Sequence, residues 1–176
     1  MKRAAVLATV LAALLAPALI FAHTNPARRA VAVQAEKTAV VLLVTWTVPS
    51  GELGDAYAAE TTWGRQGASA RKALETSLAA KAIAPLEITL DGKTVAPSSS
   101  IKLTEDPPQS GRLSAAVLLT APVAAKTAHT LTVSIRPGAD MTRAVFFDRT
   151  DGIATSDWSP EGDFLAAGHP LTVHWR

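Results

Sequence analysis

Apolar and polar residues alternate along most of the chain, a pattern typical of half-buried β-strands. The segment Thr38 to Val48 is rich in β-branched residues and ends in a regular alternation, with Val44 and Trp46 on one side. Branched and aromatic side chains fit the pleated surface of a sheet. Arg29 to Gln34 alternates in the same way, and we expect the two segments to form a hairpin.

Later segments repeat this pattern between turn residues. The expected strands are Leu86–Leu90, Lys93–Val95, Ile101–Thr104, Arg112–Thr120, His129–Ile135, Arg143–Asp148 and Leu171–Trp175. Asp91-Gly92, between the first two, is a strong hairpin signal. Roughly eight or nine short strands with Gly and Pro between them predict a mainly β fold, an immunoglobulin-like β-sandwich.

One part of the chain has a helical pattern instead. Residues 54–84 are rich in Ala, Glu, Lys and Arg, and we expect a short helical insertion there. A stripe of apolar residues repeats every four positions, the spacing of one helix face, at Ala70, Leu74, Leu78 and Ala82. Ser69 is suited to cap this helix. We interpret the insertion as a cover for apolar sheet surface.

The first residues have the layout of a secretory signal peptide, in which a basic start precedes an apolar run. Lys2 and Arg3 are followed by the uncharged run Ala4 to Leu15. We expect this leader to be removed, which places the protein in the periplasm or outside the cell and leaves no integral membrane segment.

Two cleavage points compete. A cut before His23 gives a signal peptide of residues 1–22 and a single mature domain of residues 23–176. A cut before Leu19 leaves an apolar Leu-Ile-Phe-Ala end in water, which the hydrophobic effect disfavours. We therefore favour the cut before His23.

Removal of the leader changes the charge of the chain. Two of its 17 Lys and Arg residues lie in the leader, so 15 basic residues remain against 15 acidic ones. A neutral domain lacks the basic surface that binds nucleic acid, and we expect no such partner. The sequence has no cysteine, which excludes disulfides and thiolate metal ligands.

Four histidines are the candidate metal ligands. A mature N-terminus at His23 places an amino group beside an imidazole, and such nitrogen donors suit Cu(II). His129, His169 or His174 would complete that copper site. The alternation puts His129 on the core side of its strand, where a hydrogen-bonded histidine at the core edge is the alternative, and puts His174 on the solvent side. His169 lies in a Gly-His-Pro turn.

Acidic residues gather late in the chain, at Asp148, Asp151, Asp157, Glu161 and Asp163. Their spacing does not follow a calcium-binding loop, and Asp residues in loops mostly form turns. The sequence contains no Gly-x-Ser-x-Gly elbow around a nucleophilic serine. We predict no catalytic residues, no enzymatic activity and no cofactor other than copper.

Several short segments resemble the exported β-domain of HupE/UreJ-type membrane proteins. They are His23, Trp46-Thr47-Val48-Pro49, Gly67-Ala68-Ser69, Leu86 to Gly92 and His129-Thr130-Leu131. The resemblance implies an exported β fold, which in that family precedes a membrane part associated with metal uptake. Members often carry a carboxylate-rich run before the helix, whereas Arg65 to Lys72 contains no acid. The chain also resembles CopC-type copper carriers, and this resemblance rests on His23 alone.

These patterns predict a non-enzymatic binding or accessory module of the bacterial cell envelope, with a membrane protein or another envelope protein as its partner. Trp63, Trp158 and the helical insertion are the surface expected to meet that partner. The alternative is a periplasmic copper(II)-binding protein that uses His23.

Overall fold

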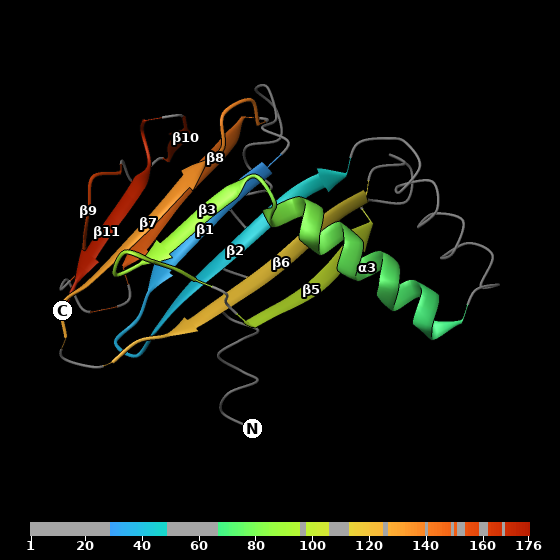
Figure 1. The fold of residues 1–176 in the computed structure, drawn as a ribbon, viewed down its shortest axis with the longest axis horizontal. Helices are drawn as coiled ribbons and strands as arrows, with labels where there is room; N and C mark the ends of the chain where they lie inside the picture. The colour runs from blue at the N-terminus through green and yellow to red at the C-terminus, as the bar shows by residue number, and fades with distance from the viewer. Residues whose placement is uncertain are drawn as a thin grey trace.

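The described part of the chain forms two packed β-sheets and a single helix, arranged as Figure 1 shows. The computed structural model describes residues 29–48, 67–95, 98–105, 113–124, 127–139, 141–148, 150, 154–158, 162–166 and 168–176. The predicted signal peptide, His23 and Trp63 lie outside these residues. No helix within the described ranges is long and apolar enough to cross a membrane.

The larger sheet contains six of the described strands, in the order β10-β8-β1-β2-β6-β5. Their bounds are β1 (Arg29–Ala35), β2 (Ala39–Val48), β5 (Ser98–Glu105), β6 (Leu113–Pro122), β8 (Thr142–Asp148) and β10 (Asp163–Leu165). β1 and β2 form the hairpin that the sequence predicts, while β1 also pairs with β8 in parallel.

The smaller sheet contains the other five described strands, in the order β4-β3-β7-β11-β9. They are β3 (Leu86–Leu90), β4 (Lys93–Thr94), β7 (His129–Ile135), β9 (Thr155–Ser156) and β11 (Leu171–Trp175). The sheets together confirm the predicted mainly β sandwich.

The core lies between the two sheets, where alternate residues of each strand meet. Val31 and Val33 of β1 and Leu131 and Val133 of β7 are at most 1% exposed. Burying a side chain of this size contributes about 1.5–3 kcal/mol. The alternation of apolar and polar residues therefore forms the core, because every second side chain of a strand lies on the same face of the sheet.

The helix α3 (Ala68–Ile83) packs against β2, β5 and β6, which confirms its interpretation as a cover for the sheet. Leu78 and Ala82 of the predicted stripe are fully buried. The predicted cap is wrong, because Gly67 occupies the N-cap position and Ser69 lies inside the first turn. Of the expected insertion over residues 54–84, positions 54–66 fall outside the described part.

The charged side chain of Arg29 joins β1 to the end of this helix. Its Nε donates to the carbonyl of Ala82 at 2.8 Å, and its guanidinium lies 5.8 Å from the ring centre of Trp46, its neighbour across the hairpin. A cation is stabilised at a helix C-terminus, where carbonyl groups lack helical partners. The buried arginine therefore fixes where α3 ends on the sheet.

Candidate functional site

The most connected polar cluster in the described residues begins at the turn between β3 and β4. Asp91 and Gly92 have φ angles of 53° and 74°, both left-handed, as a two-residue hairpin turn requires. The amide of Asp91 donates to the carbonyl of Thr130 at 2.8 Å, and the amide of Thr130 donates to Oδ1 of Asp91 at 2.8 Å. The turn is thereby fixed to the first residues of β7.

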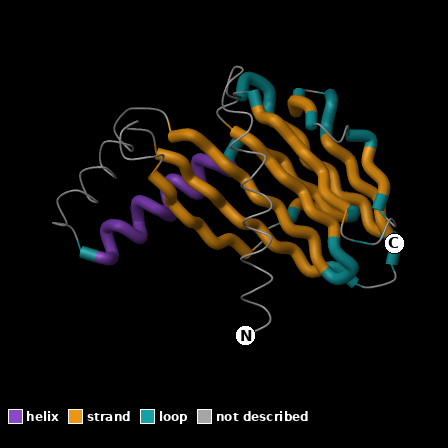
Figure 2. The backbone as a smooth tube through the Cα atoms, turned by 180° about the vertical axis from the view of Figure 1, so that it is seen from behind, coloured by secondary structure: helices purple, strands orange, loops and turns teal. Residues whose placement is uncertain are grey.

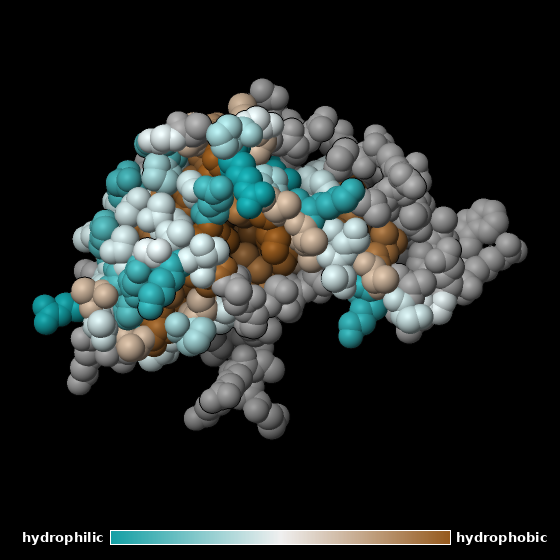
Figure 3. Space-filling model, viewed as in Figure 1, coloured by the Kyte–Doolittle hydropathy of each residue, from teal (hydrophilic) through white to brown (hydrophobic). Residues whose placement is uncertain are grey.

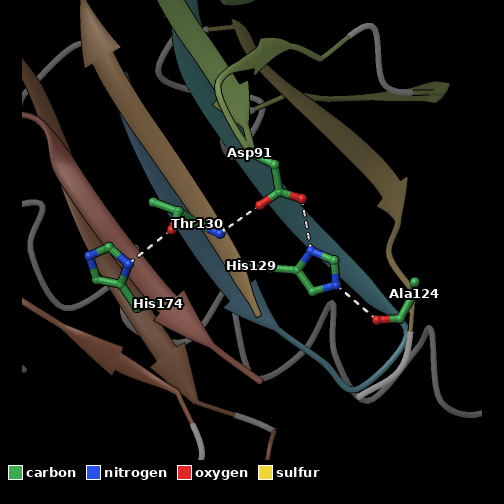
Figure 4. A network of polar contacts seen from close by, with 5 residues as sticks. All are labelled: Asp91, Ala124, His129, Thr130 and His174. Carbon is green, nitrogen blue, oxygen red and sulfur yellow. Dashed lines mark hydrogen bonds and ion pairs between the residues drawn. The ribbon is translucent and has the colours of Figure 1, made fainter. Parts of the chain in front are cut away.

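His129, the first residue of β7, continues this cluster (Figure 4). Its Nδ1 lies 2.9 Å from Oδ2 of Asp91, and its Nε2 lies 2.8 Å from the carbonyl oxygen of Ala124. A carboxylate and a carbonyl oxygen can only accept hydrogen bonds, whereas neutral imidazole has one donor and one acceptor nitrogen. Both contacts are hydrogen bonds only when the ring is an imidazolium.

The electrostatics of the pair agree with this protonation state. The hydrogen bond to Ala124 raises the pKa of His129 above its ordinary 6.5, with a further contribution from Asp91 and against the opposing effect of burial. The hydrogen bond with His129 lowers the pKa of Asp91 below 3.8, and the amide of Thr130 adds to that shift. A cation next to an anion is therefore the favoured state between these values.

Two further residues of β11 contact the cluster. The rings of His129 and Trp175 lie 5.4 Å apart at an angle of 40°, and Trp175 is buried. On the opposite face of the sheet, Nδ1 of His174 lies 3.0 Å from the hydroxyl oxygen of Thr130. The cluster thus connects β3, β7, β11 and the segment that follows β6.

His129 has the surroundings of a structural residue. It is 8% exposed, and both ring nitrogens are occupied by protein oxygens. A general base needs a free nitrogen within reach of the proton it takes, and a metal ligand needs an unprotonated one. The structure therefore places a hydrogen-bonded histidine at the core edge, as one of the two interpretations of the sequence predicts, while a role of His129 as a copper ligand stays a prediction.

The histidines proposed for a copper site lie apart in the structure. His129 and His174 point to opposite faces of the smaller sheet, because His174 pairs with Thr130 and not with His129. His174 is exposed as expected. His169 lies before the other end of β11. No group of three or more His, Asp or Glu side chains in the described segments could hold a metal ion. Because His23 is outside those segments, the copper site stays a prediction.

His169 belongs to a second cluster, around Trp158. The two rings are stacked with their centres 5.0 Å apart, and Nε2 of His169 lies 3.7 Å from Oδ2 of Asp163. The indole of Trp158 donates to the carbonyl of Ala144 at 2.7 Å. Trp158 is 8% exposed, so the prediction that it forms part of an exposed surface is wrong. Its hydrogen bond to β8 and its ring contact explain the burial.

The late carboxylates that the structure describes bind backbone amides. Oδ1 of Asp148 accepts from the amide of Thr150 at 2.7 Å, and Oδ1 of Asp157 accepts from the amide of Thr172 at 3.1 Å. These are the contacts by which Asp residues stabilise turns and loops. Asp151 and Glu161 lie outside the described residues.

Comparison of the chain with protein-family models, with curated proteins and with solved structures found no match.

Asp91 is the residue of the main cluster that the sequence did not single out. It carried a turn signal, but its contact with His129 arises from the pairing of β3 with β7, which sets Leu90 opposite Leu131. That register brings the residue after β3 beside the first residues of β7.

Proposed function

We propose that the protein is an exported, non-enzymatic binding or accessory module of the bacterial cell envelope, and that it binds an apolar segment of an envelope partner. The outer face of the larger sheet carries this proposal. The compartment is supported by the apolar leader in the sequence. The immunoglobulin-like type of the sandwich is part of the same proposal, supported by its two sheets of short strands.

One row on the outer face of the larger sheet is apolar over four adjacent strands. Since Val31 and Val33 point into the core, Ala32 points outward. Pairing aligns Ala32 with Val145 of β8 on one side and with Leu43 of β2 on the other, and aligns Leu43 with Leu118 of β6. We call these four residues the apolar row; Figure 2 shows the sheet from this side.

The rows beside the apolar row are mixed. On one side Thr45 separates Ala30 from Ala116, and on the other Gln34 and Thr120 flank Val41. The apolar members of these rows are half-buried, apart from Leu43, which is 2% exposed. The gain on binding grows with the apolar area that the partner removes from water, so the half-buried residues, and not Leu43, would supply it.

The described strands of the smaller sheet carry no comparable apolar row on their outer face. One row across four strands consists of Thr94, Thr89, Thr132 and Thr172, and the next contains Thr130 and His174. On this side of the molecule, pale and hydrophilic residues surround a contiguous apolar area in the middle of the view (Figure 3). A row of apolar residues on an outer face favours an interaction there. We therefore place the binding face on the larger sheet, at the apolar row.

Two lysine substitutions, one on each sheet, test this function. Leu118→Lys places a cation in the apolar row, and Thr132→Lys places the same cation on the polar face. We expect the tagged protein to recover an envelope protein from its native host, and expect Leu118→Lys to lose this protein while Thr132→Lys retains it. Thermal unfolding of both variants shows that each is folded. Equal recovery by both variants would contradict the proposed face.

A further inference from the structure

We propose that His129 is a proton-controlled clasp, which holds the chain at Ala124, just after β6, against the β3–β4 turn and releases it when the ring loses a proton. Two hydrogen-bond acceptors face the ring, and the clasp depends on both. Asp91 lies on the turn, and Ala124 lies in the connection between β6 and β7. It goes beyond the proposed function, because it concerns how the fold responds to its surroundings.

Loss of one proton leaves the ring unable to make both contacts. A neutral imidazole donates from one nitrogen and carries a lone pair on the other. If Nε2 kept the proton, the lone pair of Nδ1 would face the carboxylate of Asp91; if Nδ1 kept it, the lone pair of Nε2 would face the carbonyl oxygen of Ala124. Either arrangement sets two acceptors against each other at about 3 Å, where hydrogen-bonded atoms normally lie.

The contact with Ala124 is the one expected to open. A hydrogen bond to a carboxylate is stronger than one to a neutral carbonyl. Asp91 is also held in place by two hydrogen bonds with Thr130, at 2.8 Å each. The neutral ring therefore keeps its proton on Nδ1 for Asp91 and repels the carbonyl oxygen of Ala124.

The connection is where the chain passes from the larger sheet to the smaller one. β6 ends at Pro122 in the larger sheet, and β7 begins at His129 in the smaller sheet. Just before Ala124, the amide of Val123 donates to the carbonyl of Thr38 at 3.0 Å. The described part of the connection thus makes one hydrogen bond to each sheet, of which the clasp is the bond to the smaller sheet, and the side chain of Val123 also packs against the core.

The charged groups near the ring favour a change of protonation at His129. From the β3–β4 turn, Asp91 faces His129 directly, and Lys93 acts on the carboxylate of Asp91. Trp175 faces the ring from β11 and Ala124 from the connection, and neither carries a charge. In the part of the chain that the structure describes, Asp91 is thus the charged partner of the clasp.

NMR of the full chain tests the clasp. At pH 5.5 both ring nitrogens of His129 should carry a proton, and at pH 9 only Nδ1 should. The protection of the Val123 amide, corrected for the pH dependence of intrinsic exchange, should fall about 10-fold or more across this range, as expected for loss of a supporting hydrogen bond.

Two variants separate the clasp from a general effect of pH. His129→Gln carries no titratable ring and should abolish the pH dependence at Val123, while His174→Gln, on the opposite face, should retain it. If His129→Gln does not fold, Asp91→Asn serves instead, and the transition should move to lower pH because the carboxylate is lost. An unchanged transition in Asp91→Asn, the same pH dependence in His129→Gln, or a singly protonated ring at pH 5.5 would overturn the proposal.

Discussion

His129 and Asp91 are 38 residues apart in the sequence, and their side chains meet at 2.9 Å across the β3–β7 pair. The contact pairs a buried imidazolium with a carboxylate whose side chain is 45% exposed. Because water screens a carboxylate that is so accessible, we assign the strength of the pair to its hydrogen bonds more than to bare charge attraction. The pair therefore controls stability within a defined pH range.

The free energy of unfolding should be highest between the ordinary pKa values of Asp91 and His129, 3.8 and 6.5. The raised pKa of His129 gives stability that is complete below 6.5 and is lost as the pH rises through the folded value. The lowered pKa of Asp91 gives stability that is complete above 3.8 and is lost as the pH falls through its folded value. Urea unfolding at a series of pH values measures the loss of stability on the acidic side and on the alkaline side. In His129→Gln the loss on the alkaline side should disappear, and its persistence would contradict the assignment.

Gly162 should tolerate no side chain. Its φ is 80°, and a Cβ at this position would lie 2.7 Å from the carbonyl oxygen of Ala144 and 2.9 Å from Cγ2 of Val145. We expect Gly162→Ala to cost about 3 kcal/mol from left-handed strain and from the clash with β8. Gly138, with a φ of 79° and nothing within 4 Å, is the matched control. Gly138→Ala should cost about 1 kcal/mol from strain alone. Chemical denaturation compares the two, and equal costs would exclude the clash.

Leu78 should hold α3 on the larger sheet. It is fully buried, and its loss leaves a cavity between helix and sheet. We expect Leu78→Ala to lower the free energy of unfolding by about 2–5 kcal/mol. Lys72, exposed on the same helix, gives the control, and Lys72→Ala should change stability by less than about 0.5 kcal/mol. A small effect of Leu78→Ala in urea unfolding would mean that the helix is not needed to cover the sheet.

The exported protein should begin at His23. Intact mass of the protein recovered from the periplasm or medium distinguishes this start from the alternative at Leu19. A start at Leu19 would remove the amino-terminal copper chelate. If the start is His23, titration with Cu(II) tests the remaining alternative, and equal affinity of the wild type and His23→Ala would exclude copper binding through that residue.

Much of the strand pattern could be predicted because local signals and tertiary pairing agree. β7 and β11 have the predicted bounds, since alternating apolar residues fill both strands between clear turn residues. β5 begins at Ser98, before the predicted Ile101, because pairing with β6 extends it through serines that have no strong strand preference. The short strands β9 and β10 were not predicted, because two or three residues carry no measurable period.

The candidate site could be predicted only in part. The sequence placed His129 at the core edge and a hairpin turn at Asp91, but each signal is local. Their contact depends on the register of β3 against β7, and the contact with Ala124 depends on the path between the sheets. The burial of Trp158 has the same kind of cause, because it depends on the carbonyl of Ala144, 14 residues earlier on β8, and on how the chain folds back to that strand. The sequence also did not show which outward-facing residues lie side by side across the strands.

The most direct test of the proposed function is photo-crosslinking in the native host, with the photoreactive residue at position 118 in the apolar row or at position 132 on the polar face. We predict that position 118 captures one envelope protein reproducibly, through an apolar segment that mass spectrometry of the crosslinked peptide identifies. Position 132 should capture none. Crosslinks to the same protein from position 132 alone, or equally from both positions, would contradict the assignment of the larger sheet as the binding face.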